Sequence, residues 1–115
     1  MNNSGPLEIL KSVFGYIAFR PFQEDIIDSV LSCQDTVVLM PTGGGKSLCY
    51  QIPALVKSGT AIVISPLIAL MKDQVDALRL HGVAAAFLTS TQSQEEQSHI
   101  FSQLRSGELK LLYLA

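Results

Sequence analysis

Hydrophobic and polar positions divide this chain into a helical first part and an alternating second part. Up to about residue 31, apolar residues recur three and four positions apart behind Pro6 and again behind Pro21, which predicts two amphipathic helices. Glycine and aromatic residues over 15–20 predict a connector between these helices. The expected apolar faces are Leu7, Leu10, Val13 and Phe14 in the first helix and Phe22, Ile26, Ile27, Val30 and Leu31 in the second.

The second part alternates short apolar runs with helical patterns, which predicts β-strands separated by single helices. The expected strands are Thr36–Met40, Thr60–Ser65, Val83–Leu88 and Leu109–Leu114. The expected helices are Gly45–Ser58 with a kink at Pro53, Ile68–His81 with Leu70, Met71, Gln74, Val75 and Leu78 on one side, and Ser93–Ser106 with a capping box of Ser93 and Glu96. Because continuously apolar strands are typical of parallel sheets buried on both faces, we predict an α/β fold.

Composition limits the chain to one domain and narrows how it could contact nucleic acid. A chain of 115 residues can bury a single core, and 48% hydrophobic with 16% charged residues is typical of a sequence that folds. The net charge of −2 argues against a surface coated in basic residues. Any nucleic-acid contact would therefore depend on a few positioned groups.

The remaining composition adds no sign of a membrane partner or a metal cluster. No apolar run approaches the length that crosses a bilayer, and Met1–Gly5 lacks the basic start of a signal peptide, so we expect a cytoplasmic protein. Cys33 and Cys49 show no metal-ligand spacing and are expected to stay reduced. His81 and His99 have no carboxylate or cysteine partner nearby in sequence and are expected at the surface.

Residues Pro41–Ser47 lie between a predicted strand and a predicted helix, which is the setting of a phosphate-binding Walker A loop. The residues expected to aim backbone amides at phosphate oxygens, beside the positive end of the helix dipole, are Thr42, Gly43, Gly44 and Gly45. Lys46 is the candidate catalytic residue, reaching the β- and γ-phosphates, and the Ser47 hydroxyl is the candidate Mg²⁺ ligand. Met40 stands where the full pattern has glycine, and the alternative is a glycine-rich turn with an exposed lysine.

Pro-Thr in front of the glycines is typical of superfamily 2 helicases, and most of the chain resembles the N-terminal part of a RecQ-family DNA helicase. The resemblance rests on Phe14–Tyr16 with Phe19–Gln23, Met40–Gln51, Val63–Gln74 and Leu111–Ala115. In that family the first stretch resembles the adenine-recognition motif, the second is motif I and the third is motif Ia. The resemblance implies a P-loop NTPase (RecA-like) parallel sheet with flanking helices.

The adenine-recognition stretch supplies three candidate ATP-binding residues. The Gln23 amide has both a donor and an acceptor and can pair with N6 and N7 of adenine, which would favour ATP over GTP. Tyr16 can offer a ring face to the nucleotide, and Arg20 a planar cation. The alternatives are that Gln23 is a solvated helix position and that Tyr16 is a core aromatic residue.

Candidate DNA-binding residues follow the second expected strand. Ser65, Pro66 and Leu67 end that strand where open α/β sheets place their ligands, and the resemblance implies that they grip the backbone of single-stranded DNA. Lys72 lies farther along the next helix and is either a DNA contact or an ordinary solvated position. Residues Thr89–Thr91 follow the third strand and either bind phosphates or form a plain turn.

The resemblance also implies how the chain is organised. Residues 1–35 would form a helical segment with the adenine-recognition motif, and residues 36–115 the first part of a helicase RecA-like domain. No Walker B carboxylate, water-orienting group or arginine finger is read before Ala115. We therefore expect a truncated, incomplete domain that by itself hydrolyses almost no ATP.

The function implied is that of an ATP-dependent 3′ to 5′ DNA helicase, acting in DNA repair and recombination at the bacterial nucleoid. Its cofactors would be ATP and Mg²⁺, and its partners single-stranded and duplex DNA. An RNA helicase of the same superfamily and a non-catalytic nucleotide-binding module are the alternatives that the sequence leaves open.

Overall fold

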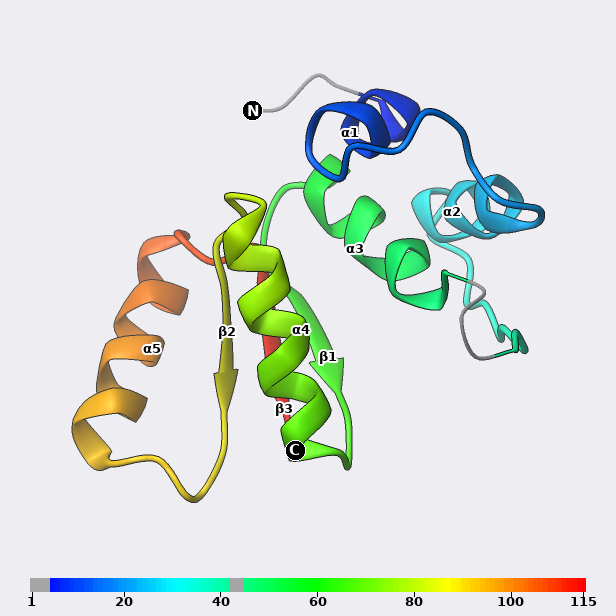
Figure 1. The fold of residues 1–115 in the computed structure, drawn as a ribbon. Coiled ribbons are helices and arrows are strands. Elements are labelled where there is room, and N and C mark those ends of the chain that lie inside the picture. Colours follow the sequence, from blue (N-terminus) through cyan, green and yellow to red (C-terminus); the bar gives the residue numbers. More distant parts are fainter. Residues whose placement is uncertain (1–4, 42–44) are drawn as a thin grey trace. The chain divides into compact units, whose positions relative to one another are not determined.

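The computed structural model describes residues 5–41 and 45–115, which form two compact units, one up to Ser58 and one from Gly59 (Figure 1). The first unit contains the helices α1 (Pro6–Ser12), α2 (Gln23–Leu31) and α3 (Lys46–Val56), and α3 contacts both of the others. Their core consists of the buried residues Ile9, Leu10, Ile27 and Ile52. The three predicted helices of this part of the chain are thus confirmed, and the predicted domain boundary at residue 36 stays a prediction.

Three expectations for the first unit are wrong. Leu7 does not belong to the buried face of α1, where Ile9 and Leu10 are buried and Leu7 is 42% exposed. Phe22 does not lie on a buried helix face, because α2 begins one residue later and the Phe22 side chain is 73% exposed. The segment Thr36–Met40 forms no strand, and Val37 and Leu39 are 93% and 94% exposed. A strand requires a hydrogen-bonded neighbour, and in the described part of the chain this segment has no strand partner.

The helix after the phosphate loop continues through its proline. Pro53 lies inside α3, which runs on to Val56, and the Lys57 amide donates to the Pro53 carbonyl oxygen at 2.9 Å. The proline therefore does not end the helix. This helix begins at Lys46, with Gly45 as its N-cap residue, one residue after the predicted start at Gly45.

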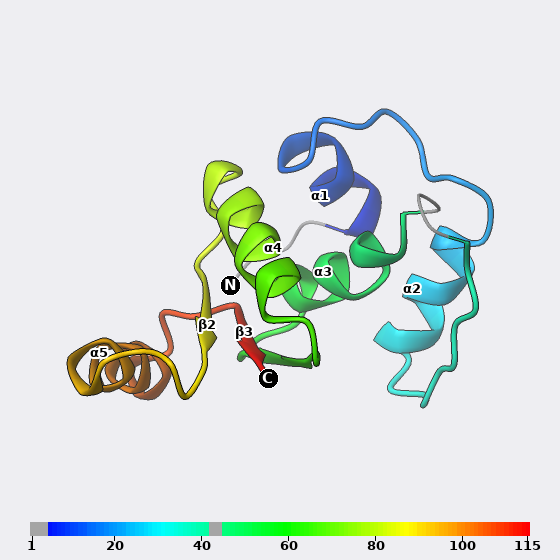
Figure 2. The same cartoon turned by 60° about the horizontal axis from the view of Figure 1, so that its bottom comes forward.

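The second unit is a parallel three-stranded sheet with two helices (Figures 1 and 2). Its elements in chain order are β1 (Ala61–Ile64), α4 (Ile68–Leu80), β2 (Ala85–Leu88), α5 (Gln94–Ser106) and β3 (Leu111–Leu114). The strand order is β1-β3-β2, with both outer strands parallel to β3. The predicted alternation of strands and helices is confirmed here, and so is the α/β class.

The two helices cover opposite faces of this sheet. On one face Ile100 and Leu104 of α5 pack with Ala86 and Leu112. Alternate strand residues point the other way, toward the face of α4, which contacts β2. The side chains that α4 buries are Met71, Val75 and Leu78.

The helices bury less of the sheet than the sequence predicts. Ile62 and Ile64 of β1 are 50% and 78% exposed, so β1 is not buried on both faces. Leu70 is 47% exposed and does not belong to the buried side of α4. Ile62 and Ile64 are exposed because α5 packs on β2 and β3 and leaves β1 uncovered on that face.

Ser93 caps the last helix, and Glu96 bonds to the Ser93 hydroxyl in place of the Ser93 amide that a capping box would use. The Ser93 Oγ accepts a hydrogen bond from the Glu96 amide at 3.2 Å and donates to the Glu96 carboxylate, also at 3.2 Å. Ser93 thus satisfies one of the free amides at the start of α5. None of the helices in the described ranges is long and apolar enough to cross a membrane.

Candidate functional site

The turn that enters α2 positions the predicted adenine-recognition residues. The Gln23 amide donates to the Arg20 carbonyl oxygen at 3.2 Å, which closes a turn over Arg20, Pro21, Phe22 and Gln23. Phe22 has φ 71° and ψ −15°, the values of the third residue in a type II turn, and Pro21 occupies the second position that such turns favour. The turn folds the Gln23 side chain back, so that its Oε1 accepts from the Arg20 amide at 2.7 Å.

Gln23 also reaches the end of the phosphate loop. Its Nε2 donates to the Gly45 carbonyl oxygen at 3.2 Å, and the Gln23 residue is 1% exposed. The solvated alternative for Gln23 is therefore wrong. Two motifs that lie apart in the sequence meet here through one side chain.

Gly45 must be a glycine for two separate reasons. Its φ is +82°, in the left-handed region that penalises a side chain. A β-carbon built on Gly45 would overlap the Gln23 side-chain nitrogen and would lie 3.7 Å from Cδ of Arg20. Arg20, Gln23 and Gly45 therefore pack closely together at the start of α3.

The hydrogen-bonding capacity of Gln23 matters for a bound base. A glutamine amide has two N–H donors and two acceptor lone pairs, and the bonds to Arg20 and Gly45 use one of each. These bonds leave a donor and an acceptor, which is the pair that N7 and the N6 amino group of adenine require. The remaining donor and acceptor are therefore of the kinds that pair with adenine.

Tyr16 lies on the connector before this turn. Its amide donates to the Leu10 carbonyl oxygen at 3.1 Å, and its side chain is 52% exposed. It is not a core aromatic residue, so that alternative is wrong. Its ring is accessible to a ligand.

The start of α3 carries the predicted phosphate and magnesium residues. Lys46 is the first helical residue and is exposed, and Ser47 follows it. Thr42, Gly43 and Gly44 lie outside the described residues. An exposed lysine beside the positive end of a helix dipole fits a polyphosphate ligand.

Cys49, one turn along the same helix, is not a nucleophile in this arrangement. Its Sγ lies 3.8 Å from the Gly45 carbonyl oxygen, and burial raises the pKa of the thiol. A raised pKa keeps the thiol protonated, whereas the thiolate is the reactive form. Cys49 is therefore a buried thiol beside Gly45.

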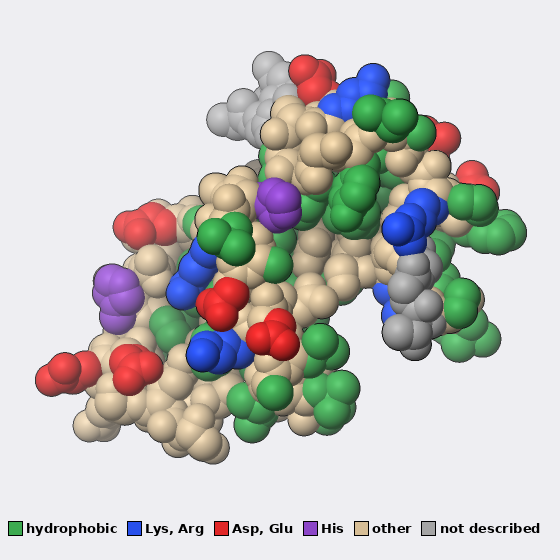
Figure 3. Space-filling view, viewed as in Figure 1, with side chains coloured by type: hydrophobic (Ala, Val, Ile, Leu, Met, Phe, Trp, Pro, Cys, Tyr) green, Lys and Arg blue, Asp and Glu red, His purple; other side chains and the backbone are tan. Residues whose placement is uncertain are grey.

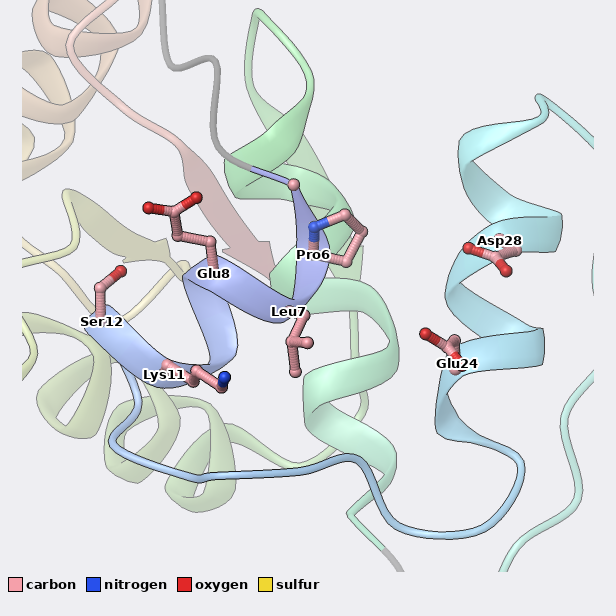
Figure 4. Close-up of a pocket in the computed structure, with 8 residues that line it drawn as sticks. Pro6, Leu7, Glu8, Lys11, Ser12, Glu24 and Asp28 are labelled. Atoms are coloured by element: carbon pink, nitrogen blue, oxygen red, sulfur yellow. The ribbon is translucent and has the colours of Figure 1, made fainter.

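A hollow of about 770 Å³ in the first unit lies between α1 and α2, away from these residues (Figure 4). Glu8 and Lys11 line it from α1, and Glu24 and Asp28 from α2, with the latter two carboxylates turned toward the opening. Its net acidic lining would repel a triphosphate. The predicted nucleotide residues therefore do not use this hollow.

The predicted DNA-contacting residues lie at the carboxyl edge of the sheet in the second unit. Ile64, Leu88 and Leu114 pair in register, so the segments that follow β1 and β2 leave from the same edge. The Ser65 amide donates to the Leu114 carbonyl oxygen at 2.8 Å, and the Ser65 Oγ accepts from the Leu67 amide at 3.2 Å. These bonds fix the path from β1 into α4.

The side chains of this edge are accessible. Pro66 is exposed, Leu67 is 58% exposed, and Lys72 is exposed on α4. No side chain caps the start of α4, where Leu67 is the N-cap residue. The described geometry suits contact with an extended ligand along the edge, with Lys72 one turn into the helix.

Hydrogen bonds stabilise the segment after β2 as a turn. The Thr89 backbone amide donates to the Gln92 Oε1 at 3.0 Å, and the Thr89 and Thr91 hydroxyls lie 2.8 Å apart. The side-chain amide of Gln97 donates to the Thr89 carbonyl oxygen at 2.9 Å. The Thr89 hydroxyl is thus engaged within the segment, and Thr89 is 5% exposed. These bonds favour the plain turn over a phosphate site centred on Thr89.

Comparison with known proteins decides the family. A family described as DEAD/DEAH box helicase matches residues 20–114, which includes both the Gln23 turn and the carboxyl edge of the sheet. The chain belongs to this family. The match confirms the helicase resemblance and agrees with a partial RecA-like α/β fold.

Similar curated proteins point to one branch of these helicases. The chain is 57% identical to the "ATP-dependent DNA helicase RecQ" of Haemophilus influenzae over 95% of its length, and 53% identical to the protein of the same name from Bacillus subtilis over 92%. The predicted RecQ resemblance is confirmed. The chain spans 18% of the length of either relative.

The sequence pattern misplaces Phe22, which lies in the turn that holds Gln23. Its spacing predicts a position on the apolar face of the second helix, whereas the structure places it in the exposed turn between Arg20 and Gln23. The signal available in the sequence was Pro21, since proline favours the second position of turns whose next residue has positive φ.

Proposed function

We propose that this chain is the ATP-binding and part of the DNA-binding region of a RecQ-type ATP-dependent DNA helicase. The observation that carries the proposal is the Gln23 side chain, which joins the adenine-recognition turn to Gly45 of the phosphate loop. A buried amide that keeps a donor and an acceptor beside a phosphate loop suits recognition of an adenine nucleotide. The names of the relatives support DNA as the substrate.

Each predicted nucleotide-binding residue would contact a different part of the nucleotide. Gln23 would read the adenine edge, Tyr16 would offer a ring face to the base, and the Arg20 guanidinium would contact the nucleotide. Gly45, with the residues before it, would turn amides toward the phosphates, and Lys46 would neutralise the β- and γ-phosphates. Ser47 would ligate Mg²⁺, which when bound offsets phosphate charge and orients the γ-phosphate.

The carboxyl edge of the sheet would hold the DNA. Ser65, Pro66 and Leu67 present an exposed, hydrogen-bonded strand-to-helix junction, and Lys72 adds a positive charge on the following helix. A few positioned groups suffice for a chain whose net charge is −2. We propose that the whole protein moves 3′ to 5′ on single-stranded DNA and unwinds duplexes in the cytoplasm, at the nucleoid.

Hydrolysis and unwinding by the intact protein test this function. We expect DNA-stimulated ATP hydrolysis that Lys46→Ala abolishes, and unwinding of a DNA duplex with a 3′ single-stranded tail. Unwinding of RNA duplexes alone would assign the protein to RNA instead. ATP binding without any DNA-stimulated turnover would indicate a non-catalytic nucleotide module.

The adenine assignment has its own test. Gln23→Ala should reduce the preference for ATP over GTP, measured as the ratio of the two dissociation constants. Gln23→Glu is the matched variant, because it keeps the size of the side chain but removes the N–H donors. An unchanged ratio in both variants would show that Gln23 does not read the base.

A further inference from the structure

Phe22 combines a strained backbone with an exposed ring. Its φ of 71° lies in the left-handed region, which is costly for an aromatic residue and free of strain for glycine. The side chain is 73% exposed, so the ring adds little to the core of the first unit. Folding by itself therefore gives no reason for phenylalanine at this position.

The position of Phe22 adjoins the predicted adenine site. It lies in the turn between Arg20, whose Cδ approaches Gly45, and Gln23, whose amide bonds to the Gly45 carbonyl oxygen. Tyr16 and Ile17 on the same connector are 52% and 87% exposed. Figure 3 shows hydrophobic side chains gathered at the surface where this connector enters α2. An apolar surface thus continues from the turn that holds Gln23.

We propose that Phe22 is a further base-contacting residue, whose ring packs against the adenine of bound ATP while Gln23 reads its edge. The inference rests on the proposed ATP site and adds a residue that the adenine-recognition pattern does not supply. A backbone outlier that persists beside a ligand site is expected when the strained conformation serves binding. The ring contact would strengthen binding of any purine base, because every base has a flat face, whereas Gln23 selects adenine.

Binding measurements on the intact protein distinguish the contribution of the Phe22 ring from that of its backbone conformation. Phe22→Ala removes the ring and keeps a β-carbon in the strained conformation, and Phe22→Gly removes both the ring and the strain. Both variants should weaken ATP binding by about fivefold or more, the loss expected for one aromatic stack on a base. Binding of inorganic tripolyphosphate, which has no base, should not change, and Phe22→Trp should retain ATP affinity.

Two control variants make the outcome specific. Phe101→Ala removes the same ring from α5, where it is 42% exposed, and should leave ATP binding unchanged. Lys46→Ala should weaken binding of both ATP and tripolyphosphate. If Phe22→Ala binds ATP as the wild type does while Lys46→Ala does not, the role of Phe22 is wrong and the ATP site stands. If only Phe22→Gly weakens binding, the backbone and not the ring is responsible, and the proposal is also wrong. If the wild type binds neither ligand, both proposals fail.

Discussion

Replacing Gly45 by alanine tests the contact that joins the adenine turn to the phosphate loop. The φ of +82° should cost about 1–2 kcal/mol for any side chain. The new β-carbon would overlap the Gln23 nitrogen, so the amide must move and lose its bonds to Gly45 and Arg20, each with a net value of about 0.5–1.5 kcal/mol. Alanine recovers about 0.5–1 kcal/mol by restricting the unfolded chain. The net expectation is a loss of about 2–3 kcal/mol.

A double-mutant cycle isolates the overlap from the backbone strain. In a Gln23→Ala background the overlap is absent, so Gly45→Ala should cost only about 1 kcal/mol, which gives a coupling energy of about 1–2 kcal/mol. Denaturant unfolding of the intact protein measures all four variants. Gly107→Ala is the matched control, because Gly107 has φ +79° with no atom within 4 Å of a built β-carbon, and it should cost about 1 kcal/mol in either background. Equal costs of Gly45→Ala in both backgrounds would refute the contact.

Further predictions concern residues outside the contact. Cys33 is exposed with φ 60° just beyond α2, so Cys33→Gly should stabilise the protein by about 0.5–1 kcal/mol in denaturant unfolding, whereas Cys33→Ala should not. Ser93→Ala removes the bond to the Glu96 amide and should cost about 1 kcal/mol, with faster amide hydrogen exchange at the start of α5; unchanged exchange there would contradict the cap. Burial raises the pKa of the Cys49 thiol above its ordinary 9.0, so the folded state holds the thiol proton more tightly than the unfolded state does. The free energy of unfolding should therefore keep this contribution below pH 9.0 and lose it as the pH rises above 9.0. An alkylating reagent should modify Cys33 well before Cys49, and equal rates would show that Cys49 is not buried.

The helices and three of the strands could be predicted because they depend on local signals, whereas the roles of the nucleotide residues stay predictions. Period and capping residues placed α4 and α5 within one or two residues of their observed bounds. The Walker A pattern placed the start of α3 within one residue of Lys46, because its chemistry requires a fixed spacing along the chain. The Gln23 prediction came from the resemblance, and its role in binding stays a prediction.

Other expectations were wrong because they depended on neighbours that are distant in sequence. The run Thr36–Met40 has the composition of a strand, but composition cannot supply the hydrogen-bonded partner that a strand needs. The exposed faces of Ile62 and Ile64 follow from how far α5 reaches across the sheet. Phe22 has the spacing of a buried helix position, yet the turn geometry set by Pro21 places it outside the helix.

The sequence by itself determined the α/β class, the helicase resemblance and the residue types suited to adenine, phosphate and magnesium, because these follow from periodicity and from motifs of fixed spacing. Only the tertiary structure decided that the Gln23 amide is buried against Gly45, that Gly45 has no room for a side chain, and that Phe22 is strained and exposed beside them. The physical reason is that side-chain burial and positive φ are set by which segments pack together. Local patterns in the sequence do not specify which distant segments pack together.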